Sequence, residues 1–156
     1  GIPAWREPSL LPLVVGTGLA EGAALAIVLD IAADAASTGV LLVLLIVLVV
    51  LRAAVWWRYR SRMNGSSNLP NRTRETLASI HSVMLVAGTL LPLVAAGSAW
   101  AIPAWQNPAA VIAALLAIAA GWQFKFALVT KAAQVQGYAL GATLRRGHPL
   151  AQTRRQ

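Results

Sequence analysis

SLLPLVVGTGLAEGAALAIVLDIAA, at residues 9–33, is the stretch that decides the fold of this chain. About 20 apolar residues in a helix rise far enough, at roughly 1.5 Å each, to cross the ~30 Å hydrocarbon layer of a membrane. The stretch lacks the two-residue alternation of a barrel strand, and only helices and closed barrels satisfy their backbone in lipid. We therefore expect it to be a membrane-spanning helix.

Three small or charged positions indicate how this helix packs. Gly18 and Gly22 form a GxxxG pair, which allows another helix to approach closely, and we predict a helix-packing role for both. Glu21 lies beside them, near the middle of the stretch. Because a carboxylate facing lipid is costly, Glu21 is expected to face protein.

The composition of the whole chain favours the same class of protein. Of its 156 residues, 58% are hydrophobic and 12% are charged, whereas soluble domains carry about 25% charged residues. The net charge of +8 does not indicate nucleic-acid binding, because most basic residues lie in two blocks beside apolar runs. The chain has no cysteine, which excludes disulfides and iron–sulfur ligation by its own residues. Since it begins at Gly1 without a methionine, we expect further residues upstream.

The chain is predicted to be an all-α integral membrane protein with four transmembrane helices in one bundle. The transmembrane domain is predicted at 1–147 and is followed by a basic tail at 148–156. Within this domain the predicted spans are 9–33, 40–57, 76–101 and 108–130. The last of them is expected to stay helical to about Leu140 and to begin with Asn107 as a cap and Pro108 as the first helical residue. A loop from Arg58 to Glu75 holds five arginines and the C-terminal stretch 144–156 holds four, so the positive-inside rule predicts cytoplasmic termini.

Four ionisable side chains, one in each predicted span, are expected to meet in the cytoplasmic half of the membrane. They are Glu21, Arg52, His81 and Lys125. Ionisable groups at membrane depth indicate function by default, since each costs at least ~2.5 kcal/mol to bury. Simpler interpretations stay open: Arg52 and Lys125 reach the interface, His81 bonds a neighbouring helix, and Glu21 is a protonated or paired structural group.

Several kinds of chemistry are excluded for this chain by itself. His81 is the one histidine in a predicted span, because His148 lies in the tail, so the chain lacks a bis-histidine haem site. No phosphate-binding loop, catalytic triad or metal-ligand cluster occurs in the sequence. We expect a membrane component with no soluble-enzyme chemistry and no metal site of its own.

Two segments resemble one family of membrane proteins. The sequence PAWREPSLLPLVVGTGLAEGAAL, from Pro3 to Leu25, is similar to the fifth-helix region of NrfD/DmsC-like anchor subunits of molybdopterin oxidoreductases. The segment from Lys125 through KAAQVQGYAL to Arg146-Gly147 resembles the pattern that closes those subunits. The order and spacing of the two segments agree with the family, and together they bracket almost the whole chain.

The resemblance implies the C-terminal half of an eight-helix, haem-free subunit in the bacterial inner membrane. Such a subunit, itself not catalytic, passes electrons between menaquinone or ubiquinone and an iron–sulfur subunit that serves a molybdenum or tungsten catalytic subunit. The relatives implied are those of DMSO-reductase and phenylacetyl-CoA:acceptor oxidoreductase complexes, some of which hold the quinone mostly in their first four helices. On this interpretation Glu21 and His81 are candidates for proton handling, and Lys125 is a candidate hydrogen-bond donor to a quinone oxygen.

Two other functions are compatible with the sequence. One is a small proton-coupled transporter or channel, in which Glu21 would be the coupling carboxylate. The other is a structural scaffold that holds other subunits in the membrane. The proteins that co-purify with the chain from native membranes would distinguish the three.

Overall fold

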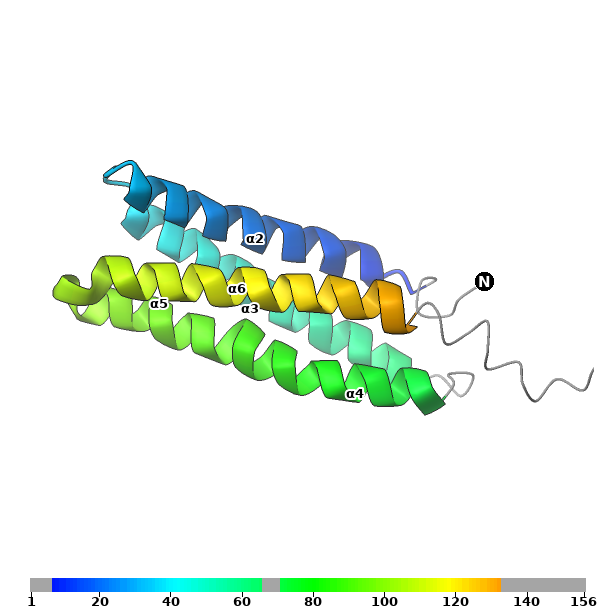
Figure 1. Cartoon of the computed structure of the whole chain (residues 1–156). Coiled ribbons are helices and arrows are strands. Elements are labelled where there is room, and N and C mark those ends of the chain that lie inside the picture. Colours follow the sequence, from blue (N-terminus) through cyan, green and yellow to red (C-terminus); the bar gives the residue numbers. More distant parts are fainter. Residues whose placement is uncertain (1–6, 66–70, 133–156) are drawn as a thin grey trace, which may run out of the picture.

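Four long helical segments form one bundle in the computed structural model, which describes residues 7–65 and 71–132 (Figure 1). The first two segments are the helices α2 (Leu10–Ala32) and α3 (Thr38–Asn64). The third consists of α4 (Asn71–Leu85), the π-helix η1 (Val86–Leu90) and α5 (Leu91–Ala101). A 3₁₀ turn, η2 (Pro103–Trp105), leads to α6 (Gln106–Ala127) and the π-helix η3 (Leu128–Ala132), and the described residues include no strand.

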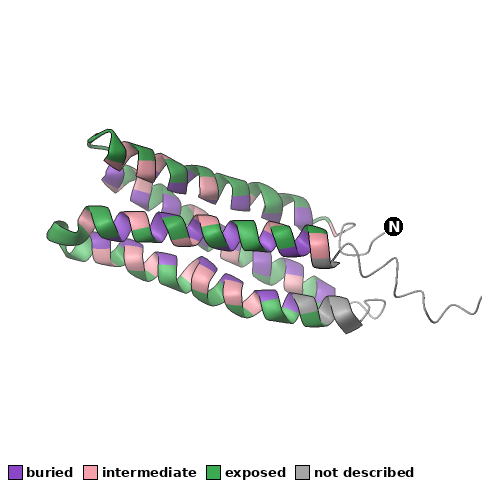
Figure 2. Ribbon diagram, in the orientation of Figure 1, coloured by how far each residue is buried: buried purple, intermediate pink, exposed green. Residues whose placement is uncertain are grey.

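All four segments are long and apolar enough to cross a membrane. The stretches that meet this test are Leu10–Ala32, Thr38–Asn64, Leu77–Ala101 and Pro103–Thr130. Large apolar side chains cover the outside of the bundle: Leu11, Val40 and Trp122 are each more than two-thirds exposed. Figure 2 shows exposed ribbon on the outer faces and buried ribbon between the helices. The structure therefore supports the prediction of a multi-pass, all-helical membrane protein.

The start of α2, the end of α3, the start of α4 and the end of α6 all lie at one end of the bundle (Figure 1). Two short turns, 33–37 and 102–105, lie at the other end. In the first turn, the Thr38 hydroxyl donates a hydrogen bond of 2.6 Å to Asp30, and Asp34 adopts a left-handed backbone conformation with φ 51°. The assignment of the other end, where α2 begins and α3 ends, to the cytoplasmic side stays a prediction.

Several helix boundaries differ from the expected ones; the third segment, for example, begins at Asn71, five residues before the predicted start of its span. The second helix continues to Asn64, seven residues past Trp57, because its buried stripe continues through Tyr59 and Met63. The fourth helix begins at Gln106, so Asn107 and Pro108 both lie inside it, and the predictions of an asparagine cap and of Pro108 as the first helical residue are wrong. The residue before the helix is Trp105, which makes no side-chain capping bond. The predicted continuation to Leu140 lies beyond Ala132 and outside the described residues.

The interior of the bundle has two parts of different composition. One part is rich in alanine: α6 buries Ala109, Ala110, Ala113, Ala114 and Ala117 against α2, α3 and α5. Small side chains let helices approach closely, which supplies van der Waals packing where lipid offers no hydrophobic drive. The other part, nearer the basic end, is built around Trp56, Tyr59, Met84 and Phe124. The ionisable side chains of the interior lie between the two parts or beside the aromatic part.

Candidate functional site

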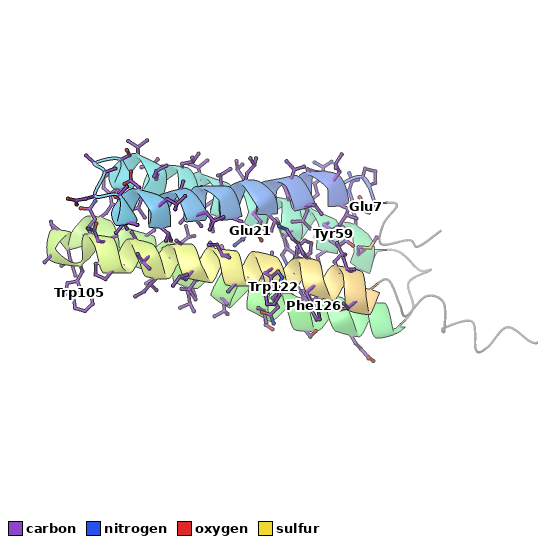
Figure 3. All side chains as sticks on the ribbon, turned by 45° about the horizontal axis from the view of Figure 1, so that its top comes forward. Glu7, Glu21, Tyr59, Trp105, Trp122 and Phe126 are labelled. Carbon is purple, nitrogen blue, oxygen red and sulfur yellow. The ribbon has the colours of Figure 1, made fainter. Side chains whose placement is uncertain are left out.

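An ion pair joins the first and last helices of the bundle. The Lys125 ammonium on α6 donates to Oε2 of Glu21 on α2, and the two side chains are 36% and 17% exposed. Figure 3 places Glu21 on the side of α2 that faces α6. The sequence prediction that Glu21 faces protein is therefore confirmed. Of the simpler interpretations, the paired carboxylate is the one that this geometry matches.

Gly121 provides the space that the Glu21 carboxyl group occupies. A Cβ atom at Gly121 would overlap Oε1 of Glu21 and would lie 3.0 Å from Cγ2 of Thr17. Thr17 is itself fixed, because its buried hydroxyl donates a hydrogen bond of 2.7 Å to the Leu13 carbonyl. The carboxyl group is thus enclosed by Thr17 and α6, and its buried Oε1 has no hydrogen-bond partner among the described residues.

Arg52 is buried at the centre of the bundle. Its side chain is 1% exposed, and its guanidinium donates to the carbonyl of Gly88 and, at 3.3 Å, to the carbonyl of Ala117. The interpretation that Arg52 reaches the membrane interface is therefore wrong. The guanidinium instead links α3 to η1 and α6, while its Nε atom has no hydrogen-bond partner in the described part of the chain.

The Gly88 carbonyl is available to Arg52 for a reason that the sequence contains. In an α-helix this carbonyl would accept a hydrogen bond from the residue four positions later, which here is Pro92. Proline has no backbone N–H, so it leaves that carbonyl without its helical donor. The π-helix η1 ends two residues before the proline, and the hydroxyl of Thr89 in η1 donates a hydrogen bond of 2.9 Å to the Met84 carbonyl in α4. Arg52 supplies the donor that Pro92 cannot.

Glu21, Arg52 and Lys125 make up one group, which we call the polar cluster. Ala117 and Gly121, which contact Arg52 and Glu21 respectively, lie one turn apart on α6. The cluster therefore draws its side chains from α2, α3 and α6, and η1 contributes a carbonyl group. In a low-dielectric interior two cations and one carboxylate interact strongly, so the three charges influence one another's placement.

His81 lies in the aromatic part of the interior and not in the polar cluster. Its Nδ1 atom accepts a hydrogen bond of 3.1 Å from the indole N–H of Trp56. The Trp56 ring stacks on Tyr59 with centroids 6.0 Å apart and meets Phe124 edge-on at 5.6 Å. Because Nδ1 is an acceptor here, the neutral imidazole carries its proton on Nε2.

Gly18 and Gly22 lie on the outside of the bundle. A Cβ atom at either position would meet nothing within 4 Å, so no described helix packs on them. The predicted packing role is not seen within this bundle. Gly121 and Gly88 fill that role instead, because a Cβ at Gly88 would lie 3.1 Å from the Ala120 side chain and 3.3 Å from Arg52. Gly88 is recognisable in the sequence as a small position in the third span, and its spacing from Pro92 indicates a free carbonyl, whereas Gly121 carries no such signal.

A pocket of about 290 Å³ lies between α4 and α6. Met84, Phe124 and Phe126 give it apolar walls, and Gln123 provides a side-chain amide. This volume is near the lower limit for small-molecule sites, which span ~300–1,000 Å³. The polar cluster and His81 do not line it. The described residues contain no group of three or more side chains that could hold a metal ion.

Comparisons with models of protein families, with curated proteins and with solved structures found no match to this chain.

Proposed function

We propose that this chain is a membrane-anchor subunit of a quinone-linked oxidoreductase complex in the bacterial inner membrane. Its partners would be an iron–sulfur subunit and a molybdenum or tungsten catalytic subunit. The chain would help to exchange electrons between the quinone pool and those partners. Cysteine is absent from its sequence, so the iron–sulfur ligands would come from the partner.

The observation that carries the proposal is the ion pair between Glu21 and Lys125. Glu21 lies in the first segment that resembles the NrfD/DmsC-like anchors, and Lys125 begins the second. Glu21 and Lys125 are 104 residues apart in the chain, yet their side chains bond inside the bundle. A paired carboxylate and ammonium at membrane depth can hold and release a proton, which quinone reduction and quinol oxidation both require.

The residues of the chain divide these tasks between two sides of α6. On the α2 side, Glu21 would take up and release the proton, with Lys125 as its ion-pair partner. On the α4 side, the pocket beside Phe124 and Phe126 offers flat apolar walls and the Gln123 amide to a quinone ring. His81 could act only through Nε2, because Trp56 occupies its Nδ1.

Replacing Glu21 by glutamine tests the proposal directly. In the complex assembled in native membranes, Glu21→Gln should lower quinol-dependent turnover by tenfold or more, because the amide keeps the shape and loses the titrating group. Glu75→Gln, on an exposed position of α4, is the matched control and should leave turnover unchanged. Normal turnover of an intact complex carrying Glu21→Gln would remove Glu21 from the mechanism.

A small proton-coupled transporter is the second candidate. It is favoured by one feature of the polar cluster: Oε1 of Glu21 is buried without a hydrogen-bond partner among the described residues, as a proton-binding site would need. Purification from native membranes separates the candidates. Iron–sulfur and molybdopterin subunits in the preparation support the anchor, whereas a homodimer without them supports the transporter. Partners present with turnover insensitive to Glu21 and Lys125 would indicate a scaffold.

A further inference from the structure

A second pocket opens where α2 begins and α3 ends, at the end of the bundle where the chain is basic. It has a volume of about 310 Å³ and is lined by Pro8, Ser9, Pro12, Val55, Arg58 and Arg62. None of these residues belongs to the polar cluster or to the pocket between α4 and α6. The pocket thus combines two guanidinium groups with apolar walls.

The guanidinium groups act on the same space because of their spacing. Arg58 and Arg62 are four residues apart on α3, so both project from one face of the helix. Arg62 bonds Glu7 at 3.1 Å, whereas no described acidic residue pairs with Arg58. With one carboxylate and two cations, the pocket keeps a net positive charge.

Glu7 is itself held in the charged form. Burial alone would raise the pKa of Glu7, but hydrogen bonds from Ser9 and Arg62 outweigh that effect and lower the pKa below its ordinary value. The Ser9 hydroxyl donates to Oε1 of Glu7 at 2.9 Å, and the same oxygen accepts the bond from Arg62. Glu7 therefore occupies part of the hydrogen-bonding capacity of Arg62 and leaves Arg58 open to an anion.

The pocket continues into an apolar surface toward the middle of the bundle. Leu51 lies one turn deeper than Val55 on α3, and Val15 lies one turn deeper than Pro12 on α2. Leu51 and Val15 are each about half exposed. An occupant with a negative head and a hydrocarbon chain would match both parts of the site, whereas a free anion would match only the arginines.

We propose that this pocket binds the phosphate group of an anionic membrane phospholipid, with Arg58 and Arg62 as its ligands. Arginine suits this role because its planar fork bonds two phosphate oxygens at once. The acyl chains lie along the apolar surface beside Val55. This site is independent of the proposed redox function and would exist in a transporter or a scaffold as well.

Native mass spectrometry of the full chain in a neutral detergent tests the site. The probes are phosphatidylglycerol and phosphatidylcholine with identical acyl chains. Phosphatidylglycerol should bind at least fivefold more tightly, and Arg58→Gln and Arg62→Gln should each weaken it about fivefold, as expected for one arginine near a membrane surface. Arg60→Gln is the matched control, since it removes the same charge from the same helix outside the pocket.

Glu7→Gln gives a result that misfolding cannot imitate. It frees Arg62 from its ion pair, so phosphatidylglycerol should bind more tightly to this variant than to the unmodified chain. The proposal is overturned if Arg60→Gln weakens binding as much as Arg58→Gln, because diffuse charge would then explain the effect. It is also overturned if the two lipids bind equally, or if millimolar inorganic phosphate displaces the lipid, since phosphate alone would then be the ligand.

Discussion

Replacing Gly121 by alanine should disrupt the ion pair between α2 and α6. The added methyl group would overlap Oε1 of Glu21 and lie 3.0 Å from Cγ2 of Thr17. The carboxyl group would have to move by roughly 1 Å to reach an ordinary contact distance, which takes Oε2 away from Lys125. The neighbours cannot simply yield, because Thr17 is bonded to its own helix and Glu21 is held by the ammonium.

The size of the effect follows from two opposing contributions. Overpacking and the disturbed ion pair together destabilise by about 2–3 kcal/mol, where the ion-pair part is kept small because Lys125 is 36% exposed. Alanine gains about 1 kcal/mol over glycine in helix propensity. We expect Gly121→Ala to lower the free energy of unfolding by about 1–2 kcal/mol, measured by denaturant titration in micelles with tryptophan fluorescence.

Two control substitutions distinguish the steric clash at Gly121 from the general effect of replacing glycine by alanine in a helix. Gly18→Ala and Gly22→Ala place the same methyl group where it meets nothing within 4 Å, so each should be neutral or stabilise by up to about 1 kcal/mol. In a Glu21→Ala background the carboxyl group is gone, and most of the penalty of Gly121→Ala should disappear. The reasoning would be refuted if Gly121→Ala were tolerated as well as Gly18→Ala, or if Glu21→Ala gave no relief.

Three further predictions concern other parts of the molecule. Arg52→Met removes the charged hydrogen bonds to two carbonyls and should lower the free energy of unfolding by about 3 kcal/mol in the same titration. Pro92→Ala restores a backbone donor for the Gly88 carbonyl, so Arg52→Met should cost less in that background. An equal cost of Arg52→Met with and without Pro92→Ala would contradict the assigned link. Trp56→Phe removes the indole N–H and leaves a smaller ring in a buried site, so it should cost about 2 kcal/mol, of which about 1 kcal/mol is the hydrogen bond, and no loss would exclude the bond to the imidazole. The lowered pKa of Glu7 means that its bonds stabilise the fold above the ordinary value of 4.5 and that this contribution is lost as the pH falls through the lowered value. The contribution is below about 1 kcal/mol because the ion pair is partly exposed. In a series of thermal melts at different pH, the melting temperature of Glu7→Gln should therefore depend less on pH than that of the unmodified chain.

The helices themselves could be predicted from the sequence because their signal is local. A run of apolar residues of sufficient length needs no knowledge of its neighbours to indicate a membrane span. The inward position of Glu21 was predictable for a similar reason, since lipid penalises a carboxylate whatever the rest of the fold. The helix ends were less certain: the packed stripe of α3 continues through Tyr59 and Met63, and only the neighbouring helices reveal that it is buried.

The direction that a small residue faces could not be predicted. Successive residues on a helix point about 100° apart, so the buried face of α2 around Ala20 and Ala24 turns Gly18 and Gly22 to roughly the opposite side. The GxxxG pattern indicates that another helix can approach closely, but it does not identify that helix. Gly121 lacks that pattern, yet it makes the closest approach because the carboxylate of another helix ends there.

The burial of Arg52 could not be predicted either, because it depends on an interaction between different spans. Near a membrane surface, an arginine side chain can extend to water, so its sequence position alone does not favour the interior. The interior becomes favourable where a carbonyl group lacks its helical donor, and in this chain Pro92 creates that condition at Gly88 in a different span. The proline in the third span and the arginine in the second each break a local rule for membrane helices. Each also satisfies the need that the other creates, so the two exceptions are better understood as one interaction between helices than as two separate defects.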